Sequence, residues 1–195
     1  MGLLQEARHL LRVYKVTPKK RLGQNFLVDE ELLNRMVSYA NLDREDVVLE
    51  IGAGLGFLTR VLSPRCKRVI ALEIDPKLVN ILRRRLSGLD NVSILRGDIL
   101  KVSVPPFNKV VSTPPYSISS PLLFWLLERD FECGILTFQK EFAERLVAIP
   151  NSKDYGRLTV TVYYRAEVEL LSYVPKGAFW PPPKVDSVIV RIKPK

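Results

Sequence analysis

Residues Val47 to Phe57 constrain the fold of this chain more than any other stretch. They read Val-Val-Leu-Glu-Ile-Gly-Ala-Gly-Leu-Gly-Phe, an aliphatic run that breaks into alternating glycines before a helical pattern begins. This order is typical of a buried strand, a tight turn and the start of a helix. The turn holds Gly52, Gly54 and Gly56. Because glycine permits positive φ and close approach to the backbone, and a helix start offers free N–H groups, the turn predicts a site for a nucleotide-like ligand.

Two later strand-like runs end in acidic residues. The aliphatic run 68–73 ends at Glu73, and the run 92–95 is followed by Gly97 and Asp98. An acid at the end of the second strand is placed to accept hydrogen bonds from both hydroxyls of a ribose. An acid after the third strand faces the same crevice, where open α/β sheets bind their ligands.

A second motif, Thr113-Pro-Pro-Tyr116, follows the strand-like run 109–112. A polar residue, two prolines and an aromatic residue in that position resemble the acceptor loop of methyltransferases that modify exocyclic amino groups. The two motifs together favour S-adenosylmethionine as cofactor and a base nitrogen as methyl acceptor. A nicotinamide-dependent oxidoreductase would share the glycine turn and the acid. However, Phe57 stands where its third glycine is expected, and the second motif would have no role.

Strand-like and helix-like segments alternate through residue 148. Helices are expected at 1–14, 76–86, 119–127 and 140–148, and Asp29 is expected to cap a further helix that begins before Leu32. This alternation implies right-handed crossovers and a doubly wound, mostly parallel sheet in an α/β fold. The segments 168–174 and 185–192 then read as two hairpin-like strands on either side of Trp180-Pro-Pro-Pro183.

The composition excludes several classes of function. The 195 residues, 47% of them hydrophobic, can bury a core and predict one domain over residues 1–195. No membrane span or secretory signal is recognisable, so a cytoplasmic protein is expected. The single histidine, His9, is far from both motifs, and Cys66 and Cys133 lack metal-ligand spacing. Neither a metal site nor histidine-based nucleophilic catalysis is therefore expected.

The charge indicates either a polyanionic partner or a solvated basic surface. The formal net charge is +9, which is compatible with nucleic-acid binding and is also common in proteins that bind no nucleic acid. Residues 1–28 are expected to form an N-terminal helix and a basic arm that runs into the loop 22–27, where Gly23 and two amide side chains indicate a shaped turn. The arm supplies three candidate RNA contacts: Lys19, Lys20 and Arg21.

These residues belong to a longer series of motifs that covers nearly the whole chain after residue 18. The motifs are Arg21-Leu-Gly-Gln-Asn-Phe-Leu27, Glu50-Ile-Gly-Ala-Gly-Leu-Gly56, Glu73-Ile-Asp75, Gly97-Asp98, Pro115-Tyr116, Gln139-Lys-Glu-Phe-Ala-Glu-Arg145, Tyr155-Gly-Arg-Leu158 and Pro182-Pro-Lys-Val-Asp-Ser187. In this order they resemble the ribosomal RNA adenine dimethylases, which convert adenines of small-subunit ribosomal RNA to N6,N6-dimethyladenine. The Lys153-Asp-Tyr155 segment is similar to the archaeal branch of that family.

The resemblance implies the Rossmann-like fold of a class I S-adenosylmethionine-dependent methyltransferase, acting as a monomer on ribosomal RNA within a small-subunit particle. It implies a helix at 156–164, although Leu158, Val160 and Val162 alternate as in a strand. Thr113 and the Pro114 carbonyl would accept hydrogen bonds from the adenine amino group, and Tyr116 would stack on the base. The cofactor would be held by Gln24, Asn25, Leu27, Gly52, Gly54, Gly56, Glu73, Ile74 and Asp98.

The chain departs from the family pattern at two places. The acceptor loop begins with Thr113, where the family usually has Asn, and the chain stops at Lys195, where the family usually continues into a small helical region. We therefore expect that C-terminal region to be absent. A second function stays open alongside methylation, that of an RNA-binding ribosome-assembly factor that keeps the fold without the methyl transfer.

Overall fold

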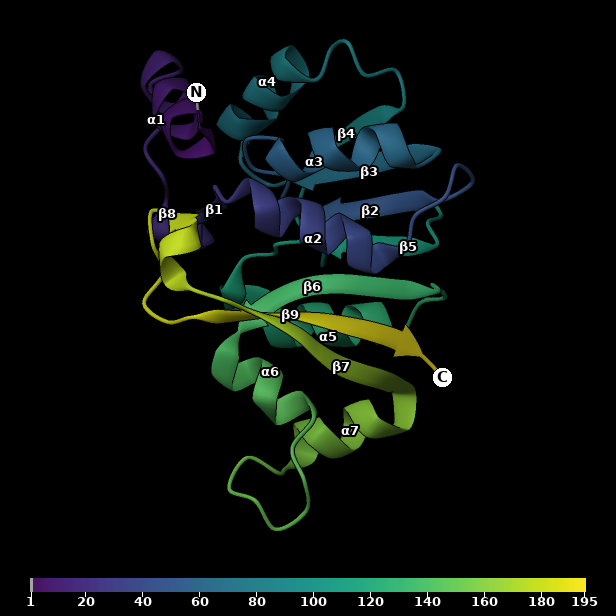
Figure 1. Cartoon of the computed structure of the whole chain (residues 1–195). Coiled ribbons are helices and arrows are strands. Elements are labelled where there is room, and N and C mark those ends of the chain that lie inside the picture. Colours follow the sequence, from purple (N-terminus) through teal and green to yellow (C-terminus); the bar gives the residue numbers. More distant parts are fainter. Residues whose placement is uncertain (1) are drawn as a thin grey trace.

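The computed structural model describes residues 2–195 and places seven strands in one sheet, in the order β4-β3-β2-β5-β6-β9-β7 (Figure 1). The strands are β2 (Val47–Ile51), β3 (Arg68–Glu73), β4 (Val92–Arg96), β5 (Lys109–Ser112), β6 (Cys133–Gln139), β7 (Ala166–Val174) and β9 (Ser187–Pro194). The strands from β4 to β6 run parallel, whereas β9 pairs with β6 and β7 pairs with β9, both in antiparallel register. The predicted doubly wound, mostly parallel sheet is confirmed, and so is the late pair of antiparallel strands.

Helices cover both faces of this sheet (Figure 1). One face carries α1 (Leu3–Val13), α2 (Glu30–Ala40), α3 (Phe57–Leu62) and α4 (Pro76–Arg85), and the other carries α5 (Ser119–Leu127), α6 (Lys140–Leu146) and α7 (Arg157–Arg165). In β2, Val48 packs toward the first set and Leu49 toward the second. Because both faces are covered, the central strands need apolar residues at successive positions.

The strand order reverses between β2 and β5. From β2 the sheet continues through β3 and β4 on one side, and through β5 and β6 on the other. The crossovers therefore leave the sheet in opposite directions at the carboxyl ends of β2 and β5, which is where open α/β sheets form a ligand-binding crevice. Both motifs found in the sequence, the glycine turn after β2 and the Pro-Pro loop after β5, lie at this point.

Most helix boundaries follow from local signals. Asp29 accepts a hydrogen bond from the Leu32 N–H at 3.0 Å, as expected of the cap of α2. The helix that follows Asp75 starts at Pro76 and ends at Arg85, one residue earlier than expected, and α6 ends at Leu146 instead of 148. The last turns of helices fray readily, so such ends are the least predictable part of an element.

The segment 156–164 is helical, and the strand suggested by its alternation is wrong. In α7, Val162 is buried and Val160 is largely exposed. Leu158 lies one turn before Val162 and packs against the same core, which is the i, i+4 spacing of one helix face. The alternating pattern arose because a short apolar segment fits both periods.

The short strand β8 (Phe179–Trp180) was not predicted. It pairs with β1 (Phe26–Leu27) in an antiparallel two-stranded ribbon beside the main sheet (Figure 1). Two residues are too few to show any periodicity, so only the three-dimensional arrangement reveals the pairing. The ribbon attaches the loop 22–27 to the segment between β7 and β9.

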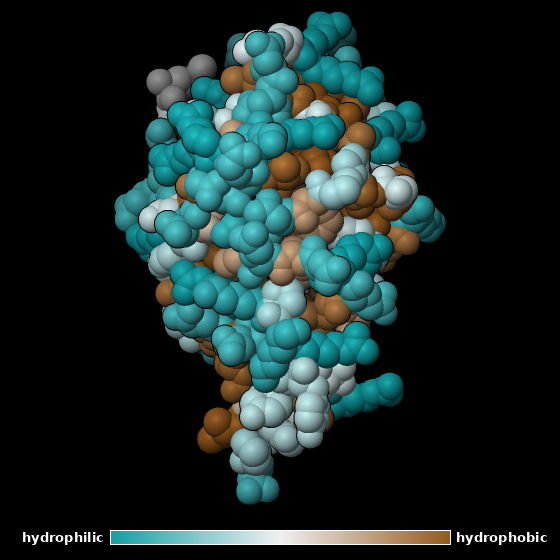
Figure 2. Space-filling model, turned by 90° about the vertical axis from the view of Figure 1, so that its right-hand side faces the viewer, coloured by the Kyte–Doolittle hydropathy of each residue, from teal (hydrophilic) through white to brown (hydrophobic). Residues whose placement is uncertain are grey.

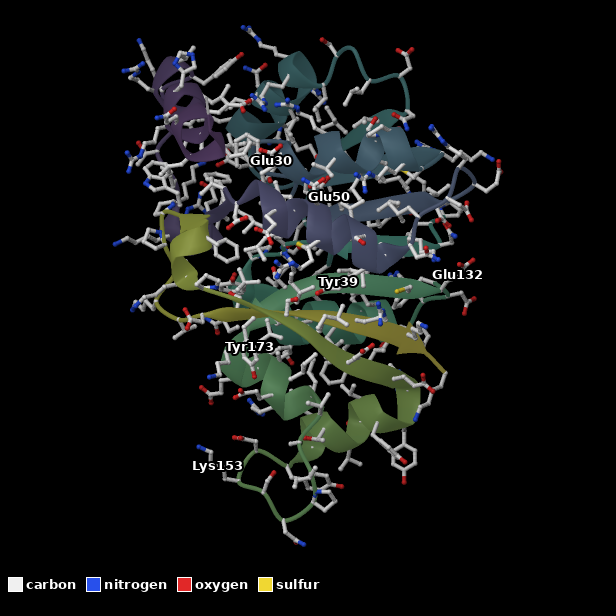
Figure 3. The ribbon with its side chains drawn as sticks, viewed as in Figure 1. Glu30, Tyr39, Glu50, Glu132, Lys153 and Tyr173 are labelled. Atoms are coloured by element: carbon white, nitrogen blue, oxygen red, sulfur yellow. The ribbon has the colours of Figure 1, made fainter. Side chains whose placement is uncertain are left out.

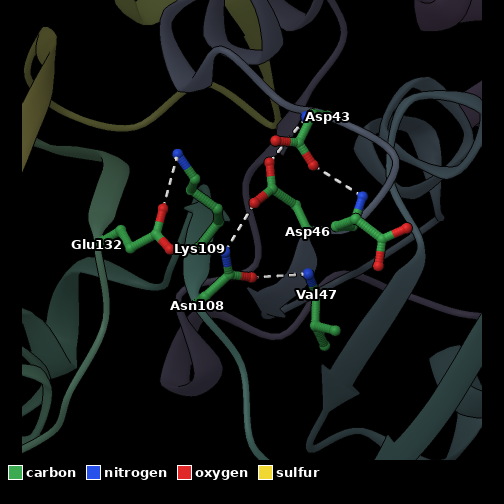
Figure 4. Close-up of polar contacts among 7 residues, drawn as sticks. Asp43, Asp46, Val47, Asn108, Lys109 and Glu132 are labelled. Atoms are coloured by element: carbon green, nitrogen blue, oxygen red, sulfur yellow. Dashed lines mark hydrogen bonds and ion pairs between the residues drawn. The ribbon is translucent and has the colours of Figure 1, made fainter.

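The opposite ends of β2 and β5 are held by a polar cluster (Figure 4). Asn108 accepts a hydrogen bond from the Val47 N–H at 2.8 Å and donates one to Asp46 at 2.7 Å, while Lys109 lies 3.5 Å from Glu132. This cluster gives buried polar groups partners at the amino ends of the strands. Figure 2, which faces this side of the molecule, shows mostly hydrophilic side chains with hydrophobic ones between them.

The N-terminal helix α1 is attached to the domain by both packing and charge. Its Ala7, Leu10 and Leu11 are buried in the core, and Glu6 forms ion pairs with Arg60 at 3.1 Å and Arg85 at 2.8 Å. None of the helices within residues 2–195 has the length and apolar character that crossing a membrane requires.

Candidate cofactor and acceptor site

One cleft opens at the carboxyl ends of β2, β3 and β5. It consists of two adjoining hollows that share four lining residues: Leu22, Gly52, Ile74 and Pro115. The first hollow extends to the loop 22–27, Glu50, Glu73 and Thr113. The second extends to Arg21 and Asp98. Most residues expected at the site from the sequence therefore meet in a single cleft, although they come from five separate segments.

The glycine turn has the backbone geometry that the sequence predicts. Gly52, Gly54 and Gly56 have φ values of 77°, 59° and 83°, which L side chains rarely adopt. A Cβ on Gly52 would lie 3.4 Å from the Pro115 ring, and one on Gly54 would lie 3.0 Å from the Phe26 ring. These two glycines thus face the cleft and its walls.

Gly56 has a different environment. A Cβ there would lie 3.0 Å from Leu82 Cδ2, on the side of α4, and Gly56 is not among the residues that line either hollow. The structure therefore places it at a helix–helix contact, where a side chain would separate α3 from α4. Sequence spacing alone cannot separate these two reasons for a glycine.

Glu73 connects the glycine turn to the end of β3. Its Oε2 accepts a hydrogen bond from the Gly54 N–H at 2.8 Å, and its Oε1 accepts one from the Asp75 N–H at 2.9 Å. Burial raises the pKa of the Glu73 carboxyl, and these backbone hydrogen bonds oppose that effect. Because each carboxylate oxygen can accept a second hydrogen bond, Glu73 can hold the turn in place and still bind a ligand hydroxyl in the cleft it lines.

Glu50 is the first residue of the motif that ends at Gly56, but the sequence did not predict it as a site residue. It is 2% exposed, lines the first hollow and accepts a hydrogen bond from the Thr59 hydroxyl at 2.6 Å. Burial raises the pKa of its carboxyl to about 8, opposed by the Thr59 hydrogen bond and increased further by the charge of Glu73. Figure 3 shows Glu50 among the ribbons in the upper half of the view, whereas Glu132 and Lys153 lie at the edges of the molecule. An acid two residues before the first glycine of the turn is the signal that could have identified it.

The loop 22–27 forms one wall of the cleft. A short turn of 3-10 helix (Lys20–Leu22) leads into Gly23, whose φ of 63° reverses the chain. Gln24, Asn25 and Leu27 then line the first hollow, and Leu27 is fixed by its pairing with Phe179. The predicted shaped loop is confirmed.

The three cations of the basic arm have unlike environments. Lys20 and Arg21 are exposed, and Arg21 borders the Asp98 end of the cleft. The Lys19 ammonium instead lies 2.8 Å from Asp75 Oδ2. At the end of the cleft that Arg21 borders, Asp98 accepts a hydrogen bond from the Leu100 N–H at 3.0 Å, which shapes the turn after β4.

The acceptor loop borders the first hollow and adjoins the loop 22–27, since a Cβ on Gly23 would lie 3.1 Å from Pro115 Cβ. Thr113 and Pro115 line that hollow. Within residues 2–195, neither the Thr113 hydroxyl nor the Pro114 carbonyl has a hydrogen-bond partner. The Thr113 hydroxyl thus remains able to accept a hydrogen bond from a ligand that enters from the cleft, whereas Pro114 is buried and lines neither hollow.

Tyr116 lies beside the cleft, with its ring edge directed at Phe179 and 6.3 Å between the ring centroids. Its hydroxyl forms a hydrogen bond with the Ser187 hydroxyl. Burial raises the pKa of Tyr116 to about 12, and the Ser187 hydrogen bond opposes this shift. The ring is therefore a neutral phenol whose orientation is set by the segment 179–187, which the sequence did not connect with the acceptor loop.

Comparisons with known proteins agree with this geometry. Residues 16–195 match the model of the family described as ribosomal RNA adenine dimethylase. The chain is 49% identical over 193 residues to a probable ribosomal RNA small subunit methyltransferase A of Methanothermobacter thermautotrophicus, and 51% identical over 196 residues to that of Methanopyrus kandleri. These matches cover 99% and 100% of this chain, and 70% of each relative.

Solved structures show the same similarity. A dimethyladenosine transferase from Plasmodium falciparum superposes with a TM-score of 0.82 and 40% identity, over 86% of this chain and 62% of that one. The 23S rRNA methyltransferase ErmE superposes with a TM-score of 0.78 and 37% identity, over 88% of this chain and 70% of that one. The chain thus spans less than two thirds of the length of the first of these structures.

Proposed function

Because the chain belongs to the ribosomal RNA adenine dimethylase family, we propose that it transfers methyl groups from S-adenosylmethionine to N6 of adenines in small-subunit ribosomal RNA. The observation that carries this proposal is the single cleft at the switch point of the sheet. It brings a glycine turn, two buried acids and the free acceptor oxygen of Thr113 to one place, and Pro114 is the next residue along the chain.

The residues of the cleft fit this cofactor. Gly52 and Gly54 form a cradle that a Cβ atom would fill, so a ligand can lie directly against the backbone. Glu73 is the candidate acceptor for the ribose hydroxyls, and Asp98 is the candidate for the adenine amine at the other end of the cleft. When bound, S-adenosylmethionine supplies a methyl group attached to a positively charged sulfur.

Charge supports the same assignment. Burial raises the pKa of both Glu50 and Glu73, because desolvation disfavours their ionised forms. A cationic ligand in the hollow would stabilise the ionised carboxylates, whereas an anionic dinucleotide would disfavour them further. The chain's own acids therefore favour a sulfonium and ammonium compound over a nicotinamide cofactor.

The acceptor loop would act on the adenine amino group. The lone pair of N6 is delocalised into the ring, so the nitrogen is a poor nucleophile until its geometry becomes pyramidal. The Thr113 hydroxyl and the Pro114 carbonyl would accept hydrogen bonds from the two amino hydrogens, which orients the nitrogen and favours that geometry. Tyr116 would stack on the base after it leaves its RNA stack. No general base is needed beforehand, because the N–H becomes acidic once the nitrogen is alkylated.

The exposed part of the basic arm supports an RNA substrate. Lys20 and Arg21 are exposed, Arg21 borders the cleft, and the chain carries a formal net charge of +9. Phosphate contacts from such residues give affinity that is independent of sequence and falls as salt rises. The choice of adenine would then depend on the pocket, and its position on the fit to the particle.

Two measurements test this function. Calorimetric titration of the protein should detect S-adenosylmethionine and not NAD, and Glu73→Ala should weaken cofactor binding about 10- to 150-fold through loss of charge-assisted hydrogen bonds. Methyl incorporation should be greatest on unmethylated small subunits, lower on naked small-subunit RNA and lowest on a short adenine-containing hairpin. The digested RNA should contain N6,N6-dimethyladenosine. Cofactor binding without methyl transfer to any of the three would instead support the assembly-factor function.

A further inference from the structure

Asp75 lies at the junction between the basic arm and the cleft, and it is the centre of a buried polar network. Its carboxylate is 0% exposed. Oδ2 accepts hydrogen bonds from the Lys19 ammonium at 2.8 Å and the Gln24 amide at 2.8 Å, and Oδ1 accepts one from the Lys77 N–H at 3.0 Å. Every partner except Lys77 comes from the N-terminal arm, more than 50 positions earlier in the chain.

The network extends from the arm to the glycine turn without interruption. The Asp75 N–H donates to Glu73 Oε1 at 2.9 Å, and Glu73 Oε2 accepts from the Gly54 N–H at 2.8 Å. On the arm, the Lys19 N–H donates to Gln24 Oε1 at 2.7 Å. The Gln24 side chain therefore takes part in the network with both its oxygen and its nitrogen. Through Asp75, Lys19 therefore fixes the loop 22–27 and the glycine turn, which both line the cleft, relative to each other.

The positive charge of Lys19 compensates the negative charge of the buried Asp75 carboxylate. Burial by itself would raise the pKa of Asp75, but the hydrogen bonds from Lys19, Gln24 and the Lys77 N–H hold it below its usual value. A buried carboxylate that loses its only cationic partner is left with an uncompensated charge, which is strongly unfavourable. The arm would then lose the contact that holds it in its present position.

We propose that Lys19 and Asp75 are positioning residues of the cofactor site, and that RNA phosphates are contacted by Lys20 and Arg21 and not by Lys19. The ion pair keeps Gln24, Asn25 and Leu27 against the cleft and holds the residues that follow Glu73 at the end of β3. This inference rests on the proposed function, because it assumes that the cleft binds S-adenosylmethionine. It divides the basic arm, which the sequence treats as one RNA-binding segment, into two parts with different roles.

The test compares two neighbouring cations. Lys19→Met keeps the length of the side chain and removes its charge, and Lys20→Met is the matched control on an exposed residue. For Lys19→Met we expect the Kd for S-adenosylmethionine, measured by calorimetry without RNA, to rise about 10- to 100-fold. The salt slope of binding to small-subunit RNA should stay the same. For Lys20→Met the cofactor Kd should stay the same, and the salt slope should fall by about one contact.

Kinetic measurements separate positioning from general damage. In Lys19→Met, the KM for the cofactor should rise while kcat at saturating cofactor is largely retained, since the acceptor loop is untouched. Lys19→Arg should restore most of the affinity. Asp75→Asn, which keeps an oxygen for the Lys77 N–H, should weaken cofactor binding without changing the arm's own cations. It also tests the pair if Lys19→Met does not fold. The double variant Lys19→Met with Asp75→Asn should lose less cofactor-binding free energy than the sum of the losses in the two single variants.

Three results would contradict the inference. Lys19→Met or Asp75→Asn could bind the cofactor as tightly as the wild type, or Lys19→Met could lower the RNA salt slope as Lys20→Met does. Unchanged cofactor affinity would mean that Lys19 and Asp75 do not position the cofactor site, and a lower salt slope would mean that Lys19 contacts RNA phosphates. Failure of the wild-type protein to bind S-adenosylmethionine would be a distinct result, because it would remove the proposed function itself and this inference with it.

Discussion

Replacing Glu50 with Gln should remove a large pH dependence from the stability of this protein. Glu50 is 2% exposed, and burial raises the pKa of its carboxyl from an ordinary value of 4.5 to about 8 in the folded state. At pH values below the unfolded-state pKa, the carboxyl is protonated in both states and its contribution to stability is fully present. At pH values between the unfolded-state and folded-state pKa, the unfolded chain releases the proton and the folded chain keeps it, so the free energy of unfolding falls as pH rises.

The size of this effect follows from the difference between the folded-state and unfolded-state pKa of Glu50. Each pH unit between the unfolded and folded pKa values costs about 1.4 kcal/mol of unfolding free energy, and the whole window costs roughly 5 kcal/mol. In Glu50→Gln, the side-chain carbonyl can still accept the hydrogen bond that the Thr59 hydroxyl donates at 2.6 Å. The variant has no proton to release, so this part of the pH dependence should disappear.

Urea unfolding followed by circular dichroism, repeated at intervals from pH 5 to pH 8, measures the difference. The stability of Glu50→Gln relative to the wild type should increase steadily with pH across this range. Glu45→Gln is the matched control, because the Glu45 side chain is 85% exposed and should give a curve parallel to the wild type. Parallel curves for Glu50→Gln and the wild type would refute the argument, since they would mean that Glu50 is ionised in the folded protein.

Three further predictions concern the acceptor loop and the glycine turn. Thr113→Val should slow methyl transfer by about 1–3 kcal/mol of activation free energy through loss of one acceptor, and Thr113→Asn should retain or raise the rate; equal rates for all three proteins on small subunits would exclude a role for this side chain. Ser187→Ala and Tyr116→Phe each remove the same hydrogen bond, so each should lower kcat several-fold without changing cofactor affinity, and the double variant should be no slower than the slower single one; additive effects would show that the bond does not orient the ring. Gly54→Ala should cost about 1–2 kcal/mol in the left-handed backbone region and bring a Cβ within 3.0 Å of Phe26, and should therefore lower the melting temperature and weaken cofactor binding. Gly88→Ala, with no atom within 4 Å of the added Cβ, is its control, and equal melting temperatures for the two would contradict the strain argument.

The sequence by itself determined the architecture and most of the cleft. Strand, turn and helix signals depend on residues that are neighbours in the chain, so the glycine turn after β2 and the alternation of elements could be read directly. A parallel sheet brings the carboxyl ends of its strands to one edge, so Glu73, Asp98 and Thr113 could be placed in one crevice from their positions alone.

The tertiary structure decided which side chains face that crevice and which are already paired. It places Gly56 against α4, buries Glu50 beside Glu73, and orients Tyr116 through Ser187. Each of these facts depends on groups from different segments, and local periodicity carries no information about such partners.

The basic arm shows the difference most clearly. In the sequence, Lys19, Lys20 and Arg21 are three adjacent cations with equal claims to bind RNA. In the structure, Lys19 reaches a carboxylate that has no exposed surface, and its two neighbours remain in solvent. Charge can be counted from a sequence, but the partner of a charge is fixed only when the chain folds and buries one of the two groups.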